Sequence, residues 1–438
     1  MTNLDPYKLW QLAKKIIPGG NMLISKRPEM HLPKLWPTYF NKTKGCFVWG
    51  LNGKKYIDVS LMGVGTNVLG YNNLYIDNQV QKAIKNGNIS TLNCPEEVEL
   101  AKEILKVNHW AQMVKFSRSG GEANSISVRI ARASTKKQHI IASGYHGWHD
   151  WYLASNLKNN QNLNNHIFPN VRSKGVINEL KNTISMFKFN DFEDFKKVYL
   201  KNKNKIGIVK VEVSRNKQPN LIFLSKIRNF CNKNKLILIF DECTSGFREY
   251  YGGIHLKYKI YPDIVTYGKA LGNGYAITAV VGKKKYMKNC EKSFVSSTFW
   301  SERIGFVAAL ATLKEMKKKR SWIYINNLGL EIKEKWRQIF KKYNFDVAID
   351  GMNSLPRFTF NNKYNLVFKT FITQEMLKKN ILATNSIYIS TSHTKKIIDN
   401  YFKNFENVIS KLSKIKNTKP IKKILKTSVC GIRMKRFD

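Results

Sequence analysis

The stretch LILIFDECTSGFREYYGGIHLKYKIYPDIVTYGKALGNGY, residues 236–275, decides the fold of this chain of 438 residues. Residues 236–240 form a continuous apolar run, which is typical of a strand buried on both faces of a parallel sheet. Asp241 follows directly, and ligands of open α/β sheets bind beyond the carboxyl ends of the strands, so we expect this carboxylate to face a site. A second short strand is predicted at residues 263–266. It runs out into Lys269, whose flanking glycines let other groups approach its amine closely.

Asp241 and Lys269 together suit pyridoxal phosphate. A lysine amine forms a Schiff base with the aldehyde of this cofactor, and a carboxylate against the pyridine nitrogen keeps the ring protonated and able to accept electrons. The alternative is an acidic strand cap and a solvated surface lysine, since the chain has 75 lysine and arginine residues. These two residues alone leave both interpretations open.

The size and charge of the chain limit its class. A chain of this length with 43% hydrophobic residues can bury a sizeable core and is expected to form one large and one smaller unit. The formal net charge of +45 raises nucleic acid or an anionic surface as a partner. The basic residues are spread along the chain and interleaved with asparagine, as at residues 201–205, rather than gathered in a recognisable binding module. We therefore expect no nucleic-acid binding, and keep a basic nucleic-acid-binding protein as the alternative outside the enzymes.

The cysteines and the ends of the chain point to an ordinary intracellular protein. The six cysteines show no CxxC or CxxH spacing, so neither a disulfide framework nor a metal site is expected. The N-terminal residues are polar and lack a signal-peptide core, and no apolar run approaches the length of a membrane span. We expect a cytoplasmic protein without a membrane partner.

Two further segments are candidates for ligand binding. A helix is predicted to start at Ser119, with Glu122 three residues later in the capping-box arrangement. Gly120 and Gly121 would leave the free amides of this helix start open to an anion, although an ordinary capped helix has the same pattern. Tyr145, which lies between glycines after a predicted strand at residues 140–143, could stack on a planar ring or belong to the core.

The remaining candidates are one histidine and one threonine. His146 is either a site residue or a hydrogen-bonded loop histidine. Thr298 lies in a hydroxyl-rich loop and could bond a phosphate. The other predicted elements are a helix at 7–17, strands at 46–49, 55–59, 206–213 and 276–281, helices at 96–107 and 304–316, and a surface loop at 156–190.

Five motifs occur in a fixed order along the chain. They are Ser119-Gly120-Gly121-Glu122-Ala123, Tyr145-His146-Gly147, Phe240-Asp241-Glu242 with Gly246-Phe247-Arg248, Gly268-Lys269 followed by glycines, and Ser297-Thr298-Phe299. In this order they resemble class III aminotransferases of pyridoxal phosphate fold type I. Within these the chain is most similar to glutamate-1-semialdehyde 2,1-aminomutase and related sugar-cluster enzymes.

The resemblance implies a role for each matching residue. Lys269 would hold the cofactor covalently and shuttle a proton between substrate and cofactor carbons, and Asp241 would pair with the pyridine nitrogen. The other cofactor-binding residues it implies are Ser119, Gly120 and Gly121 at the phosphate, Tyr145 and Cys243 on the two faces of the ring, His146, and Thr298 from the other subunit of a homodimer.

The resemblance also implies the architecture. It predicts an α/β fold with a mostly parallel, seven-stranded-type sheet between helices, and a smaller α+β domain built from the N- and C-terminal segments. The expected boundaries are an N-terminal arm and part of the small domain at 1–60, a large cofactor-binding domain at 61–318 and a C-terminal small domain at 319–438.

Three positions depart from the family pattern. Cys243 stands where an aliphatic residue is usual, and Glu212-Val213 replaces a frequent Glu-Pro. The segment after Gly20 differs from that of typical aminomutases, in which an arginine grips the substrate carboxylate, and Arg27 is the candidate to replace it. The functional hypothesis is amino-group transfer on a small amino or carbonyl substrate, either within one molecule as in the aminomutase or by a transaminase that makes an amino sugar or another surface-polymer precursor.

Overall fold

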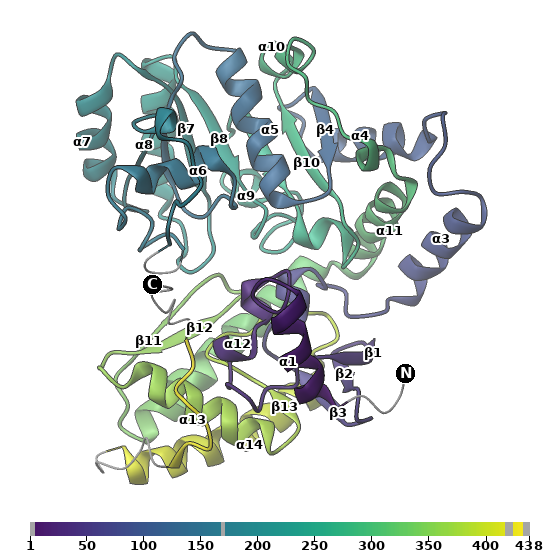
Figure 1. Ribbon diagram of the computed structural model, residues 1–438, viewed down its shortest axis with the longest axis vertical. Helices are drawn as coiled ribbons and strands as arrows, with labels where there is room; N and C mark the ends of the chain where they lie inside the picture. Colours follow the sequence, from purple (N-terminus) through teal and green to yellow (C-terminus); the bar gives the residue numbers. More distant parts are fainter. Residues whose placement is uncertain (1–4, 168–170, 417–423, 432–438) are drawn as a thin grey trace. The chain divides into compact units, whose positions relative to one another are not determined.

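The computed structural model describes residues 5–167, 171–416 and 424–431, and the chain divides into two compact units (Figure 1). One unit is Tyr75–Trp322, and the other combines Met1–Leu74 with Ile323–Asp438. The domain boundaries expected after residues 60 and 318 stay a prediction.

A seven-stranded sheet forms the centre of the unit Tyr75–Trp322. β10 is antiparallel to both its neighbours, β4 and β9, whereas the pairs from β9 to β6 are all parallel. The predicted mostly parallel α/β sheet is confirmed. In spatial order the strands are β4 (Met113–Ser117), β10 (Thr278–Gly282), β9 (Ile264–Tyr267), β8 (Ile237–Asp241), β7 (Ile206–Glu212), β5 (His139–Ser143) and β6 (Ile184–Met186).

The central strands are completely buried, as their apolar runs predict. Every residue of β7 and of β8 is buried. Parallel strands need crossover connections, and helices supply most of them. The helices of this unit are α3 (Leu74–Lys85), α4 (Pro95–Val107), α5 (Gly120–Ala133), α6 (Asp150–Leu153), α7 (Phe192–Asn202), α8 (Leu221–Lys233), α9 (Ile254–Lys257), α10 (Lys284–Met287) and α11 (Arg303–Lys319).

Helix α5 covers the middle of the sheet (Figure 1). Its apolar side chains Ala123, Ile126 and Ile130 lie in one buried cluster with Ile208 of β7 and Ile239 of β8. The helix begins with the predicted capping box, in which the Ser119 hydroxyl accepts from the Glu122 amide and the Glu122 carboxylate accepts from the Ser119 amide. The start of α5 is therefore fixed beside the carboxyl end of β4.

The segment 156–190 is not only the surface loop that its asparagine content predicts. It contains the edge strand β6, which pairs in parallel with β5, and the short 3-10 helix η4 (Asn178–Leu180). β6 has only three residues, too few for an alternating pattern to be recognised in the sequence. Its partner strand, which the sequence does not identify, decides its conformation.

The second unit is α+β, as predicted. Strand β13 pairs in parallel with β3, so the N- and C-terminal segments share one sheet. Its strands are β1 (Phe40–Lys44), β2 (Phe47–Gly50), β3 (Lys55–Asp58) and β13 (Ile381–Leu382) in one sheet and β11 (Val347–Asp350) with β12 (Arg357–Phe360) in another. Its longer helices are α1 (Pro6–Ile16), α12 (Ser321–Lys342), α13 (Asn365–Leu377) and α14 (Lys395–Ile415).

Within the described ranges, no helix combines the length and the apolar character that crossing a bilayer requires. The cytoplasmic location expected from the sequence stays a prediction.

Asp263, which directly precedes β9, bonds to residues of β8 and α8 and to the residue after β10. Its carboxylate, which is 3% exposed, accepts from the Leu238 amide at 2.9 Å, from Arg228 of α8 at 3.0 Å and from Lys283 after β10 at 2.8 Å. Burial acts to raise the pKa of Asp263, but Arg228, the Leu238 amide and Lys283 outweigh it and lower the pKa below 3.8. The ionised carboxylate therefore stabilises the sheet.

We expect Asp263→Asn to lower the free energy of unfolding by about 2–3 kcal/mol, because bonds to a charged acceptor are lost. Since the pKa is lower in the folded protein, the stabilisation by Asp263 is present above pH 3.8 and disappears as the pH falls through the folded-state pKa. Urea unfolding at pH 7 and pH 3 measures both effects. Asp399→Asn, which removes the exposed partner of Lys335, is the control and should change stability by less than about 1 kcal/mol; equal losses for the two variants would contradict the role of Asp263.

Candidate active site

The predicted site residues other than Thr298 lie at or just after the carboxyl ends of the sheet strands or at the start of α5, where ligands of open α/β sheets bind. Asp241 is the last residue of β8, and Glu212 is the last residue of the neighbouring β7. Lys269 follows β9 and opens the short 3-10 helix η5 (Lys269–Gly272). Tyr145 and His146 follow β5. All of these residues belong to the unit Tyr75–Trp322.

Asp241 is held by donors on both carboxylate oxygens. His146 Nδ1 lies 2.8 Å from Oδ2, while the Cys243 amide donates to Oδ1 at 3.0 Å. The Thr266 hydroxyl lies 3.2 Å from the same Oδ1. Burial acts to raise the pKa of Asp241, but hydrogen bonding and charge from His146, the charge of Lys210 and the Cys243 amide lower it well below its usual value. A fixed, ionised carboxylate thus lies at the end of β8.

His146 supports this carboxylate from inside the protein. Its ring is completely buried, and burial lowers its pKa although Asp241 opposes the shift. The structure thus places His146 against Asp241. Direct contact between His146 and a cofactor stays a prediction.

Lys269 is in a strained backbone conformation. Its φ of 44° lies in the left-handed region, which costs a residue with a side chain roughly 1–2 kcal/mol. Its Nζ donates to the Thr244 hydroxyl at 2.9 Å. Burial lowers the pKa of Lys269, with Cys243, Glu212 and Asp241 opposing the shift. A lowered pKa increases the fraction of free amine, which is the form that attacks a carbonyl carbon.

Two hydrogen bonds and one ion pair connect this amine to an arginine. The Thr244 hydroxyl accepts a hydrogen bond from Lys269 and donates one to Glu212 Oε1 at 3.4 Å. Arg215 Nε lies 3.3 Å from the same oxygen, and Glu212 Oε2 accepts from the Tyr145 amide at 2.9 Å. Glu212, whose role the sequence left uncertain, therefore stands at a junction between Lys269, Arg215 and Tyr145.

Tyr145 and Cys243 contact different parts of the site. The Arg215 guanidinium lies 5.5 Å from the centre of the half-buried Tyr145 ring. Cys243 Sγ lies 3.6–3.7 Å from where a Cβ would stand on Gly268 or Gly120, so it faces both the residue before Lys269 and the start of α5. Their stacking on two faces of one ring stays a prediction.

The start of α5 has the properties of an anion site. The amides of Gly120 and Gly121 belong to the first turn, which has no acceptor within the helix. A Cβ on Gly121 would lie 2.9 Å from the His149 ring, so glycine is required for this close approach. His149 Nδ1 is buried and has no hydrogen-bond partner within the described part of the chain. The free amides and this nitrogen fit a phosphate group.

Thr298 is separate from the other predicted residues. It starts the 3-10 helix η7 (Thr298–Ser301) and is exposed. Arg118 Nε donates to the Phe299 carbonyl at 2.8 Å, and Trp300 Nε1 donates to Glu122 at 3.0 Å. These bonds hold the η7 loop against the start of α5 in the same chain.

Two other sequence expectations can be placed. Arg27 lies in the unit of the terminal segments, where its Nε donates to Asn21 at 3.3 Å. Within the described ranges, no group of three or more histidine, cysteine, aspartate or glutamate residues could hold a metal ion.

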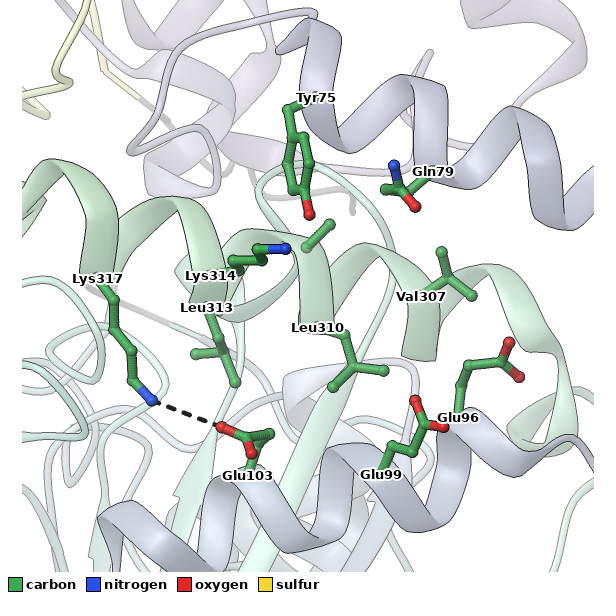
Figure 2. A pocket seen from close by; sticks show the side chains of 11 residues that line it. Tyr75, Gln79, Glu96, Glu99, Glu103, Val307, Leu310, Leu313, Lys314 and Lys317 are labelled. Atoms are coloured by element: carbon green, nitrogen blue, oxygen red, sulfur yellow. Dashed lines mark hydrogen bonds and ion pairs between the residues drawn. The ribbon is translucent and has the colours of Figure 1, made fainter.

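The pocket drawn in Figure 2 contains none of the predicted site residues. It lies between α3, α4 and α11, and Lys317 pairs with Glu103 at 3.5 Å along its edge (Figure 2). Charged side chains and leucines line it, without the amine and carboxylate pair at the strand ends.

Thr244, Arg215 and His149 were not among the site residues predicted from the sequence. Thr244 and Arg215 lie three residues after Asp241 and Glu212, so a search for polar residues just beyond strand ends would have found them. No comparable sequence signal marks His149, which follows a tryptophan within a loop.

Comparisons with known proteins agree with this geometry. The sequence profile of the family Aminotransferase class-III matches residues 32–409. The 3-aminobutyryl-CoA aminotransferase of Cloacimonas acidaminovorans (strain Evry) is 30% identical over 88% of this chain and 92% of its own length. The glutamate-1-semialdehyde 2,1-aminomutase of Wigglesworthia glossinidia brevipalpis is 32% identical over 87% of this chain and 88% of its own. A solved transaminase with PLP bound superposes with a TM-score of 0.82 at 22% identity, over 94% of this chain and 99% of that one.

We expect Thr244→Val to shift the reaction of Lys269 with pyridoxal phosphate to lower pH by about one unit, because the ammonium form loses its acceptor. The measurement is the rate at which the absorbance of the covalent complex appears in apoprotein between pH 6 and 10. Thr244→Ser keeps the hydroxyl and should follow the unsubstituted protein. A valine variant with an unchanged profile would show that Thr244 does not govern the amine.

Proposed function

The chain belongs to the class-III aminotransferases, and we propose that it acts as a homodimeric enzyme on glutamate-1-semialdehyde, in the manner of the 2,1-aminomutases it is similar to. The family makes it a pyridoxal-phosphate-dependent enzyme that moves amino groups. The substrate, the dimer and the residue roles given below are the proposal.

The observation that carries the proposal is that a half-buried amine, Lys269 Nζ, and the buried, ionised carboxylate of Asp241 follow the adjacent strands β9 and β8 at the same end of the sheet. Pyridoxal phosphate, when bound, supplies an electron sink for the carbon that carries the amino group. Asp241 would hold the proton of the ring nitrogen, and Lys269 Nζ would hold the aldehyde and move a proton of the substrate. Thr244 and Glu212 orient that amine between these events.

The other site residues would bind the cofactor and keep water away from it. Gly120 and Gly121 donate their amides to the phosphate, with Ser119 beside them and His149 near Gly121. Tyr145 would cover one face of the ring, and Cys243 would pack against the other. Because these groups are already fixed by the sheet ends and the start of α5, little reorganisation is needed when the cofactor binds.

The proposed substrate is supported by the relatives and by charge. Several relatives named glutamate-1-semialdehyde 2,1-aminomutase are 27–32% identical over 87–94% of this chain. The Arg215 guanidinium, with a side chain 25% exposed, pairs with the Glu212 carboxylate, and it would bind an acidic substrate by exchanging that carboxylate for one of the substrate. The rival is a two-substrate transaminase that makes an amino sugar or another surface-polymer precursor, and the 3-aminobutyryl-CoA aminotransferase adds a coenzyme A ester as a third substrate class to test.

The dimer is supported by the loop that carries Thr298. Thr298 is exposed, and the apolar side chains of Phe294, Phe299 and Trp148 in the same unit are 88%, 68% and 68% exposed. A second copy of the chain that covered these side chains would remove their apolar surface from water. We place Thr298 at the cofactor phosphate of a second copy of the chain.

The decisive test of the reaction is an assay without an amino donor. Incubation of the purified protein and pyridoxal phosphate with glutamate-1-semialdehyde should give 5-aminolevulinate. Lys269→Ala should lose the absorbance band of the covalent cofactor and at least about a thousandfold in rate, as expected when a covalent catalytic group is removed. Product that forms only from a keto-sugar nucleotide, or from a 3-oxoacyl-CoA, in the presence of glutamate would reject the aminomutase and support a transaminase.

The shared site is tested with hybrid dimers. Thr298→Ala alone should weaken cofactor binding about tenfold, the size of one lost bond to a charged group. In a hybrid of one Thr298→Ala subunit and one Lys269→Ala subunit, one of the two sites is complete, because it combines Lys269 of the first subunit with Thr298 of the second. Tagged hybrids should therefore bind cofactor at that site as tightly as the unsubstituted protein. A hybrid no better than the Thr298→Ala parent would rule out a site shared through Thr298.

A further inference from the structure

A completely buried lysine lies beneath the site and has no part in the proposed reaction. Lys210 is in the middle of β7, is 0% exposed and donates from Nζ to Ser127 of α5 at 3.1 Å. An ammonium group loses its hydration when it is buried, so its place inside a sheet requires a compensating charge.

The pairing of β7 with β8 shows that the compensating charge is Asp241. Lys210 pairs with Ile239 of β8, and Asp241 lies two residues further along β8, so Lys210 and Asp241 point to the same face of the sheet. From the spacing and rise of parallel strands, their backbone positions are about 8 Å apart. Ile239 and Ile208 on this face pack in the apolar cluster with α5, which leaves little water to screen the two charges.

Polar contacts lead from Lys210 to Asp241 through Ser127, both the main chain and the side chain of Asn124, and Thr266. Ser127 Oγ donates to the Asn124 carbonyl at 2.7 Å, so its lone pairs are free to accept from Lys210. The Thr266 hydroxyl lies 3.2 Å from Asn124 Oδ1 and also 3.2 Å from Asp241 Oδ1. All five residues are at most 3% exposed.

The two ionisable groups that act on Lys210, Asp241 and Cys243, both lie at the carboxyl end of β8. Burial lowers the pKa of Lys210 to about 8, and the charges of Asp241 and Cys243 act in the opposite direction. On its other side Asp241 bonds His146, while Ser127 and Asn124 on α5 are neutral. At neutral pH Lys210 is therefore largely protonated, and becomes neutral as the pH rises through about 8.

We propose that Lys210 is a positioning residue that shares the negative charge of Asp241 from beneath the site and so limits how firmly this carboxylate keeps the cofactor's ring nitrogen protonated. This inference rests on the proposed role of Asp241. A protonated ring nitrogen adds a second positive charge beside one carboxylate, and the two cations repel each other through a poorly screened interior. Lys210 thereby influences how strongly the ring withdraws electrons from the substrate carbon, without touching the substrate.

The test compares Lys210→Met with Lys205→Met, which removes an exposed lysine just before the same strand. Each apoprotein is loaded with pyridoxal phosphate labelled with ¹⁵N in the ring, and the nitrogen resonance is followed from pH 6 to 10. We expect the ring nitrogen of Lys210→Met to stay protonated to a pH higher by about one unit or more, the size of the repulsion between unit charges at this spacing. The unsubstituted protein and Lys205→Met should share one profile.

A cofactor analogue whose ring lacks the nitrogen provides a second test of the inference. With 1-deazapyridoxal 5'-phosphate, the ratio of dissociation constants for Lys210→Met and the unsubstituted protein should be close to one, whereas with pyridoxal phosphate the Lys210→Met protein should bind severalfold more tightly at pH 7. A merely structural lysine would alter both cofactors equally. If Lys210→Met does not fold, Ser127→Ala removes the acceptor of Lys210 together with the bond from Ser127 to the Asn124 carbonyl, and it should shift the nitrogen profile in the same direction because the ammonium form of Lys210 is less stabilised.

Nitrogen profiles that coincide in the Lys210 or Ser127 variant and the unsubstituted protein would overturn the inference while leaving the proposed function intact. Failure of the unsubstituted protein to form a coloured complex with pyridoxal phosphate would instead reject the proposed function, and the inference with it.

Discussion

The central constraint in this protein is a negative charge that has to stay ionised while almost completely buried. Asp241, which is 2% exposed, ends a strand whose other residues are all buried, so water cannot solvate its carboxylate. The protein replaces that water with His146, the Cys243 amide and Thr266, each from a different segment. The loops after β5 and β8 and the strand β9 are held in their places around this one group.

Close packing and local strain position the groups that surround Asp241. Lys269 has a left-handed backbone that a lysine does not normally adopt, and the glycines at 268 and 272 flank it. At Gly121 a Cβ would lie 2.9 Å from the His149 ring, so any larger residue would require that ring to move. Strain and close approach of this kind persist only where the surrounding structure imposes them, which agrees with a site that is assembled before its ligand arrives.

Charged residues that lie behind Lys269 and Asp241 are also held in place by polar contacts. Glu212 links Lys269 to Arg215 through Thr244, while polar groups of α5 and β9 lead from Lys210 to Asp241. The amine and the carboxylate each have a counter-charge of their own. The high positive charge of the chain is therefore used in at least two places within the fold, although most lysines lie at the surface.

The sequence by itself determined the elements and the chemistry that they carry. The apolar runs of β7 and β8, the capping box at Ser119 and the order of the five motifs are local properties, and they predicted the parallel sheet, the family and the pair Asp241 and Lys269. Tertiary structure decided which groups meet. The edge strand β6 depends on its partner β5, and the contacts of Asp241 with His146, and of Lys269 with Thr244, join residues 95 and 25 positions apart. Burial and charge at such distances depend on how the strands pair, and no pattern within a single segment records that pairing.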